Sequence, residues 1–330
     1  MLSFRTSHSS PSSIGRREFL RIGGLGLGGL TLSDMLGLQA AVKQGNPALK
    51  DKSVIFLFMH GGPSQFETFD PKMDAAREIR SVTGEIRTTV PGVTFGSTFE
   101  KLARLADKFS IVRSFVPGDA NHDIKTIVGK DTLKANIGSL YSRVAGPLRR
   151  DSAMPTNVAL FPQAVDPKTQ PAFLKFGDFT SGGEIGAAYR PFVPGAGSNA
   201  QADMSLNLPI ERLNDRRTLL ASLDGWKREM DHGDAVAGMS NLQQMAFDVL
   251  RRGVSDAFDL SKEDARLIAR YDTAPLLPKS RIDPKWKNIE HYADNAASLG
   301  KLLLLARRLC ERGCGFVTVT TSFVWDMHAD

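Results

Sequence analysis

The chain has 330 residues, of which 42% are hydrophobic and 24% are charged, and this is enough apolar material for the core of one large soluble domain. Its formal net charge of +6 is scattered along the sequence, which argues against nucleic-acid binding because that function needs a basic face. With only two cysteines, Cys310 and Cys314, the sequence excludes a disulfide framework. These two could form a bridge in an oxidising compartment, but we favour packing at a helix end as small apolar residues.

The beginning of the chain has the organisation of a twin-arginine export signal. Arg16 and Arg17 precede a weakly apolar, glycine-rich run from Ile22 to Leu38, which small residues follow. A transmembrane anchor is the alternative, but the glycines break up the roughly 20 strongly apolar residues that a span needs. We therefore expect residues 1–40 to be a signal peptide read by the export machinery, with no transmembrane span left after cleavage. The mature domain, residues 41–330, would lie in the periplasm or outside the cell.

Strand and helix patterns alternate after the signal. Ser53 to Met59 is a continuous apolar run, as expected for a first central strand buried on both faces of a parallel sheet. Ser97-Thr98-Phe99-Glu100 has the form of a capping box, and apolar residues follow it at helical spacing. The run from Phe109 to Phe115 predicts the next strand. This alternation indicates an α/β sheet.

The end of the chain repeats the strand and helix pattern. An apolar stripe from Leu299 to Cys310 predicts a helix, Gly313 its cap, and Gly315 to Phe323 a β-branched strand. We interpret the Pro/Gly-rich stretch from Met154 to Gly197 as surface excursions. A helical cap is expected at about residues 205–275.

Several sequence blocks resemble an uncharacterised family catalogued as domain of unknown function 1501. They occur in the family's order and span nearly all of residues 50–330. The blocks are Met59-His60-Gly61-Gly62-Pro63-Ser64-Gln65, Thr68-Phe69-Asp70-Pro71-Lys72, Ala257-Phe258-Asp259-Leu260-Ser261, Leu304-Leu305-Ala306-Arg307-Arg308-Leu309 and Trp325-Asp326-Met327-His328.

The resemblance implies an alkaline-phosphatase-like α/β fold, with a mostly parallel central sheet between helical layers and a site at the carboxyl ends of its strands. Enzymes of that wider, sulfatase-like superfamily hydrolyse or transfer phosphate and sulfate esters with divalent metals held by Asp and His. The family continues past its Trp-Asp-x-His block with another strand and further motifs. We therefore expect a truncated chain whose sheet is incomplete at its C-terminal end, with an unpaired edge.

The first candidate site residues, His60 and Asp70, follow the first predicted strand. Open α/β sheets bind ligands at this position, and the glycines after His60 allow a bound group to approach the backbone. A tight turn with Asp70 in a local cap is the alternative.

Asp326 and His328 follow the last predicted strand. Alternation along an extended segment sends both side chains to one side, where carboxylate and imidazole can hold a divalent cation such as Zn²⁺, Mn²⁺, Mg²⁺ or Ca²⁺. The superfamily resemblance implies such a ligand pair, whereas two solvated polar residues are the alternative.

Asn121 and His122, within Asp119-Ala120-Asn121-His122-Asp123, are the candidate catalytic residues. The superfamily places a Ser, Thr or formylglycine-forming Cys at the corresponding helix start, and this pentad contains none, which weakens a covalent mechanism. His122 is interpreted as a metal ligand, a general base or a structural residue. His232 and His291 lie in polar stretches and are interpreted as surface residues.

Two functions follow from these patterns. The first is an exported, metal-dependent hydrolase acting on phosphate or sulfate esters, such as a sulfated glycan. The second is a non-catalytic exported protein of the same fold that binds a glycan or a protein partner.

Overall fold

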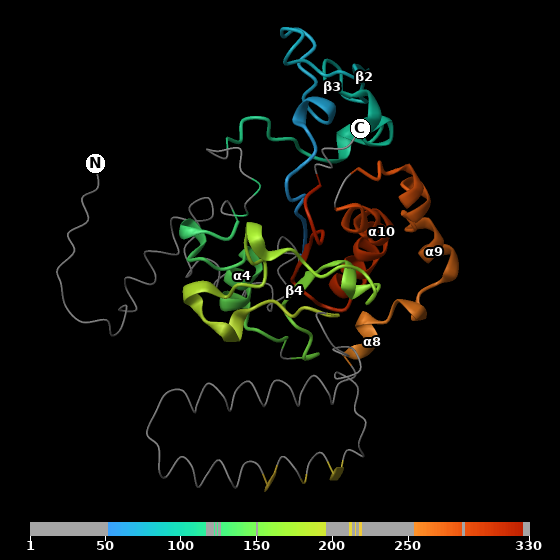
Figure 1. The fold of residues 1–330 in the computed structure, drawn as a ribbon. Helices are drawn as coiled ribbons and strands as arrows, with labels where there is room; N and C mark the ends of the chain where they lie inside the picture. Colours follow the sequence, from blue (N-terminus) through green and yellow to red (C-terminus); the bar gives the residue numbers. More distant parts are fainter. Residues whose placement is uncertain are drawn as a thin grey trace, which may run out of the picture. The chain divides into compact units, whose positions relative to one another are not determined.

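The fold is mixed α/β with a small parallel sheet (Figure 1). The computed structural model describes residues 52–116, 122, 124, 127–149, 151–195, 211–212, 215, 218–219, 254–285 and 288–325. The predicted signal peptide, and most of the predicted helical cap, lie outside these ranges. Across the part of the chain that is described, no helix is both long and apolar enough to cross a membrane.

Three strands form the parallel sheet, in the order β1-β5-β4. These strands are β1 (Val54–Leu57), β4 (Asn157–Leu160) and β5 (Phe316–Val319). The central strand β5 pairs Phe316 with Val54 on one side and with Asn157 on the other. All residues of β4 and β5 are buried, whereas the β1 residues Val54 and Ile55 remain 43% and 42% exposed. The expectation of a first central strand buried on both faces was therefore wrong: β1 lies at an edge of the described sheet, and its first two residues lack cover.

The 23-residue helix α10 (Ile289–Glu311) covers one face of the sheet. Its buried Leu302, Leu305 and Leu309 share a core cluster with Val317 and Val319 of β5. The short helix α8 (Ser255–Phe258) adds Phe258, which is 1% exposed, to the same cluster. The predicted helical stripe is thus confirmed, whereas α8, expected in a cap, belongs to the core. Burying each large apolar side chain contributes about 1.5–3 kcal/mol before the entropy of folding is counted.

The connection from α10 to β5 closes as the sequence predicts. Gly313 has φ +98°, and its N–H donates to Cys310 O at 3.0 Å. The next N–H, of Cys314, donates to Leu309 O at 2.9 Å. This pair of hydrogen bonds is the Schellman arrangement, which needs a left-handed residue and so favours glycine.

The two cysteines are free thiols, and Cys314 is completely buried beside β5. Burial raises the pKa of Cys314 to about 12 and also raises the pKa of the half-buried Cys310. The packing interpretation of this pair is therefore the one that the structure supports.

Cys314 is expected to resist iodoacetamide in the native protein at pH 8, because alkylation requires the thiolate. Both cysteines should be alkylated once the chain is unfolded in guanidinium, and mass spectrometry of tryptic peptides separates the two sites. Native labelling of Cys314 as fast as that of a free thiol, or an intact bridge to Cys310, would contradict the expectation.

The opposite face of the sheet is covered by irregular chain and by α4 (Ile137–Ala145). Phe56, Ala159 and Phe161 pack there against Ile124 and Phe179. The strand β4 and much of this cover fall within the Met154 to Gly197 stretch, which was expected to form surface excursions. That expectation is corrected for residues 157–164, where buried residues dominate.

A second, antiparallel pair consists of β2 (Glu85–Arg87) and β3 (Thr94–Gly96), followed by α3 (Glu100–Ala103). The predicted capping box does not form, because Ser97 to Phe99 is a 3-10 turn without a capping side chain. The strand predicted at Phe109 to Phe115 is also absent from the described pairings, and this segment has neither helix nor strand. Phe109 instead stacks on Phe95 at 6.1 Å.

One further short helix, α9 (Ala265–Arg270), begins at Asp264, whose carboxylate accepts hydrogen bonds from the N–H groups of Arg266 and Leu267. The remaining described helical elements are short 3-10 helices. Their bounds are η1 Gln65–Glu67, η2 Ser97–Phe99, η3 Ala106–Lys108, η4 Lys130–Thr132, η5 Pro162–Ala164, η6 Leu174–Phe176, η7 Gly183–Ile185, η8 Ala187–Tyr189, η9 Leu260–Lys262, η10 Ala274–Leu276 and η11 Lys279–Arg281.

Candidate functional site

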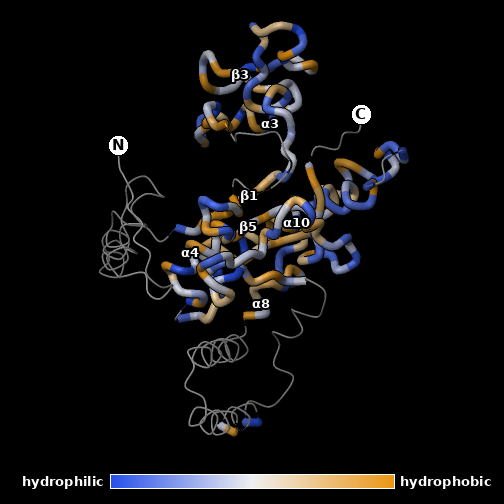
Figure 2. The backbone as a smooth tube through the Cα atoms, turned by 60° about the vertical axis from the view of Figure 1, so that its left-hand side comes forward, coloured by the Kyte–Doolittle hydropathy of each residue, from blue (hydrophilic) through white to orange (hydrophobic). Residues whose placement is uncertain are grey.

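The candidate site lies at the carboxyl edge of the parallel sheet. The three strands run in the same direction, so the segments that follow Leu57, Leu160 and Val319 all leave from one edge. Open α/β sheets bind their ligands at this edge. The residues of β1 that lead to it form a hydrophobic segment of the tube in Figure 2.

His60 turns into this edge directly after β1. Gly61 and Gly62 follow with φ +76° and +51°, and the Gly62 N–H donates to Met59 O at 2.8 Å, which closes the turn. Both angles lie in the left-handed region that glycine adopts without strain. The turn therefore explains why glycines occupy these two positions, and it reverses the chain immediately after His60.

The His60 ring is buried, at 5% exposure, among aromatic side chains. It stacks on Phe58 at 6.2 Å and meets Phe176 and Phe179 edge-on at 5.1 and 6.0 Å. Its Nε2 is hydrogen-bonded to the backbone oxygen of His122, which can only accept, so Nε2 carries the proton. In the neutral ring this tautomer leaves the lone pair on Nδ1.

His122 therefore lies next to His60, as predicted for two residues of one site. The ring of His122 is half-buried and stands 5.9 Å from the ring of Phe176. Its neighbour Asn121, the other candidate catalytic residue, lies outside the described residues.

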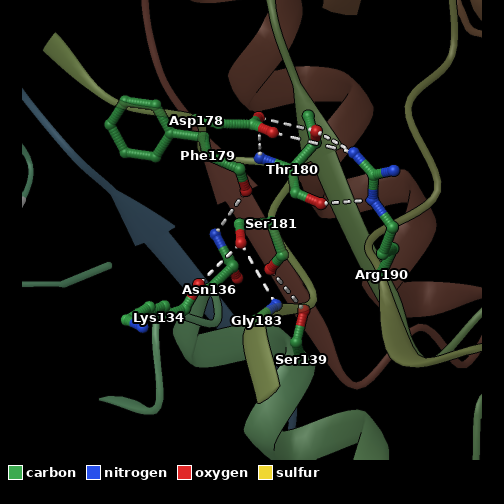
Figure 3. Close-up of polar contacts among 9 residues, drawn as sticks. All are labelled: Lys134, Asn136, Ser139, Asp178, Phe179, Thr180, Ser181, Gly183 and Arg190. Carbon is green, nitrogen blue, oxygen red and sulfur yellow. Dashed lines mark hydrogen bonds and ion pairs between the residues drawn. The ribbon is translucent and has the colours of Figure 1, made fainter. Parts of the chain in front are cut away.

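The rings of Phe58, Phe176 and Phe179 form an aromatic box around His60. Polar contacts position the backbone at Phe179 (Figure 3). The Phe179 carbonyl accepts a hydrogen bond at 2.9 Å from Asn136 Nδ2, and the Asn136 side-chain oxygen caps α4 through Gly138 N. On the other side of Phe179, Arg190 Nε donates to Thr180 O at 2.8 Å. These contacts hold the backbone on both sides of Phe179 in place, and so hold its ring against His60.

The segment after β5 runs beside the segment after β1. Thr320 Oγ1 donates to Phe58 O at 3.2 Å, and the Trp325 N–H donates to His60 O at 2.6 Å. Asp326 is the next residue along the chain, but Asp326 and His328 lie outside the described residues. The last described residue, Trp325, is thus hydrogen-bonded to the His60 peptide.

Asp70 has different partners. Its carboxylate forms ion pairs with Lys72 Nζ at 2.9 Å and with Arg113 at 3.7 Å, and its side chain is 14% exposed. Its own N–H donates to Gln65 O at 2.9 Å. This arrangement favours the alternative of a local structural role, because two cations already neutralise the carboxylate.

His291 was expected on the surface and is instead half-buried at the start of α10. Its Nδ1 lies 3.0 Å from the hydroxyl of Ser322, and Asn295 Oδ1 accepts from both the N–H and the hydroxyl of Ser322. Burial lowers the pKa of His291, with Asp294 acting in the opposite direction. The sequence analysis missed this contact, although the polar run from Thr320 to Ser322 directly after the strand was a usable signal. His232 lies outside the described residues.

Within the described ranges, no three His, Cys, Asp or Glu side chains are arranged to hold a metal ion. The described part of the site contributes two imidazoles, His60 and His122, and the two remaining candidate ligands belong to the segment after Trp325.

The sequence profile of the family described as "Protein of unknown function (DUF1501)" matches residues 51–330. No curated protein and no solved structure matches the chain.

Proposed function

We propose, from the premise that the chain belongs to the DUF1501 family, that it is an exported, metal-dependent hydrolase of phosphate or sulfate esters with an alkaline-phosphatase-like sheet. The proposed substrates are anionic esters, including sulfated glycans. Supporting this proposal are the parallel sheet, the two histidines at its carboxyl edge and the strand-end position of the Trp-Asp-x-His block.

One observation carries the proposal. The hydrogen bond from Trp325 N to His60 O joins the segment after β5 to the segment after β1. Asp326 follows Trp325 directly, so its backbone begins within one residue of that bond. We propose that residues from the two strand ends bind a single ion there, which is the arrangement that a metal-dependent ester hydrolase needs.

His60, Asp326 and His328 are the proposed metal ligands. Two imidazoles and one carboxylate suit Zn²⁺ better than Mn²⁺, Mg²⁺ or Ca²⁺, which prefer oxygen ligands. The tautomer of His60 fits this role, because Nε2–H donates to His122 O and the lone pair resides on Nδ1. When bound, such an ion would polarise the ester and offset its negative charge.

His122 is the proposed general base, with Asn121 beside it as a polar contact for the substrate. A water oxygen forms the new bond to phosphorus or sulfur while the bond to the ester oxygen breaks. One water proton passes to His122 and then to the departing alcohol oxygen. This direct route suits a site whose Asp119-Ala120-Asn121-His122-Asp123 pentad lacks a Ser, Thr or Cys nucleophile.

The same pentad favours one second function. A chain that keeps the fold but lacks the nucleophile could be a non-catalytic exported protein that binds a glycan or a protein partner. In that case Asp326 and His328 would be dispensable for binding.

Metal analysis combined with turnover of aryl phosphates and aryl sulfates separates the two functions. The purified protein is expected to contain a divalent metal and to hydrolyse one ester class, and Asp326→Ala with His328→Ala should abolish both properties. Asp283→Asn, an exposed carboxylate paired locally with Lys285, is the control and should retain both. Absence of metal and turnover from the wild type, with glycan binding that survives the double substitution, would overturn the hydrolase in favour of the binding protein.

A further inference from the structure

A cleft of about 330 Å³ lies in the unit formed by β2, β3 and α3, where the end of β2 and the segment after it lie beside α3. Its lining includes the apolar side chain of Ile86 and three charged side chains, those of Arg87, Glu100 and Arg104. Two guanidinium groups therefore share the cleft with one carboxylate, and positive charge is in excess. A concave site with this excess favours an anion over a neutral or cationic ligand.

Hydrogen bonds hold the two walls of the cleft in place. Thr88, Thr89 and Ala103 complete its lining. The Thr89 N–H, on the segment after β2, donates to Ala103 O of α3 at 3.1 Å and so joins one wall to the other. The Thr88 hydroxyl donates to Val93 O at 2.9 Å, within the turn between β2 and β3. The shape of the cleft is therefore set by the fold of this unit.

The two arginines of the cleft differ in their contacts. Arg104 pairs with Glu100 one helical turn away, but the two side chains are 74% and 68% exposed, so this pair contributes little. The Arg87 guanidinium has no ion-pair or hydrogen-bond partner among the described residues. A guanidinium carries five N–H donors and no acceptor. Arg87 therefore offers a ligand in the cleft only donors and a positive charge.

We infer that this cleft binds one organic oxyanion, a carboxylate or sulfate group on a body the size of one ring, with the charged group at Arg87 and the body against Ile86. The planar guanidinium matches two oxygens of such a group with parallel hydrogen bonds. The volume supports a ring-sized body, because it lies at the lower end of the roughly 300–1,000 Å³ of small-molecule pockets and exceeds what a bare inorganic anion fills.

This site goes beyond the proposed ester hydrolysis and stands without it. No residue of its lining is a proposed metal ligand or the proposed general base. Sugar rings that carry a carboxylate and sugar rings that carry a sulfate share the required chemistry. The cleft would hold one such acidic unit without hydrolysing it.

Fluorine NMR of the full chain measures binding of 4-fluorobenzoate and 4-fluorobenzamide, two probes of nearly equal shape of which only the benzoate is anionic. We expect the wild type to bind the benzoate about fivefold more tightly than the benzamide, and Arg87→Met to remove that preference. A third probe, 4-fluorobenzenesulfonate, is not an ester and cannot be hydrolysed. Tighter binding of the sulfonate than of the benzoate assigns the cleft to sulfated rings, and weaker binding assigns it to carboxylated rings.

Two further variants fix the location of the binding. Glu100→Gln removes the carboxylate and releases Arg104, so it should strengthen benzoate binding by about threefold. Arg77→Met is the matched control, because Arg77 is an exposed arginine that does not line the cleft, and it should change nothing. Thermal melts show that each variant remains folded.

No preference for the benzoate in the wild type, or equal losses in Arg87→Met and Arg77→Met, would overturn the inference. The preference should persist in the Asp326→Ala, His328→Ala protein, which excludes anion binding at the proposed metal site. Its loss there would also overturn the inference. Ester turnover without Arg87-dependent binding would sink the cleft assignment alone, and Arg87-dependent binding without metal or turnover would sink the hydrolase alone.

Discussion

Replacing Arg308 with alanine is expected to destabilise the domain by about 3 kcal/mol, because a buried ion pair loses one partner. Arg308 lies on α10 with 7% of its side chain exposed, and it forms an ion pair with Glu263, which is 18% exposed. It also donates to Ala257 O at 3.1 Å and to Asp256 O at 2.9 Å. Its loss would leave a partly buried carboxylate and two backbone oxygens without their donor.

The neighbouring Arg307 is the matched control. It pairs with Glu311 one helical turn away, at 2.8 Å, and also interacts with the Tyr271 side chain, but both members of the ion pair are about half exposed. Surface pairs of this spacing contribute about 0.3–0.5 kcal/mol, so Arg307→Ala should be close to neutral. Urea denaturation of both variants measures the free energies of unfolding. Losses that agree within about 0.5 kcal/mol would show that the Arg308 contacts do not hold α8 to α10.

Gly300→Ala is expected to destabilise the domain by about 3 kcal/mol although alanine is the better helix former. Gly300 is a buried position on α10, and an added Cβ would lie 1.7 Å from the backbone oxygen of Tyr271. Backbone at Tyr271 cannot rotate away as a side chain would, so the segment must separate from the helix. Helix propensity alone predicts the opposite sign, a gain of about 1 kcal/mol.

Ala297→Gly, on the same helix, isolates that propensity and should cost no more than about 1 kcal/mol. Thermal melts followed by circular dichroism compare the two variants with the wild type. A Gly300→Ala protein that melts above the wild type would contradict the close approach of Tyr271.

The end of the fold could be predicted from the sequence because several local signals agree there. The Leu299 to Cys310 stripe, the cap at Gly313 and the β-branched run that follows all point to one helix entering one strand, and α10 and β5 are found there. Each signal depends on neighbouring residues, so no knowledge of the remote chain was needed.

The run from Phe109 to Phe115 was predicted as a strand, and the described structure has no strand there. An apolar run predicts that its side chains are buried, but it does not predict which part of the chain packs against them. Here Phe109 stacks on Phe95, Ile111 packs into the same cluster, and Arg113 donates to Phe69 O at 2.6 Å. The segment is therefore covered only in part, beside β3 and without described sheet pairing, because Val112 and Phe115 remain 74% and 70% exposed. In contrast, β4 was missed because its short run of Asn157 to Leu160 lies between Pro155 and Pro162.

The structure brings together the two predicted site histidines that it describes and gives the predicted carboxylate of Asp70 other partners. His60 was chosen because it follows a predicted strand and His122 because its pentad precedes a predicted helix, and the two residues meet at the backbone oxygen of His122. Asp70 is close to His60 in sequence, but Arg113, which pairs with it, is remote and leaves no local trace. The box of Phe58, Phe176 and Phe179 around His60 likewise arises from long-range packing.

The order β1-β5-β4 has a consequence for synthesis of the chain. The strands β1 and β4 each pair with β5 and not with each other, and β5 is translated more than 250 residues after β1. Such a high contact order is typical of slow folding. The sheet cannot assemble until β5 has been synthesised and has left the ribosome. Until then the apolar residues of β1 need protection, a task suited to a chaperone that holds the nascent chain. If the twin-arginine leader operates as expected, this delay falls entirely in the cytoplasm, before transport begins.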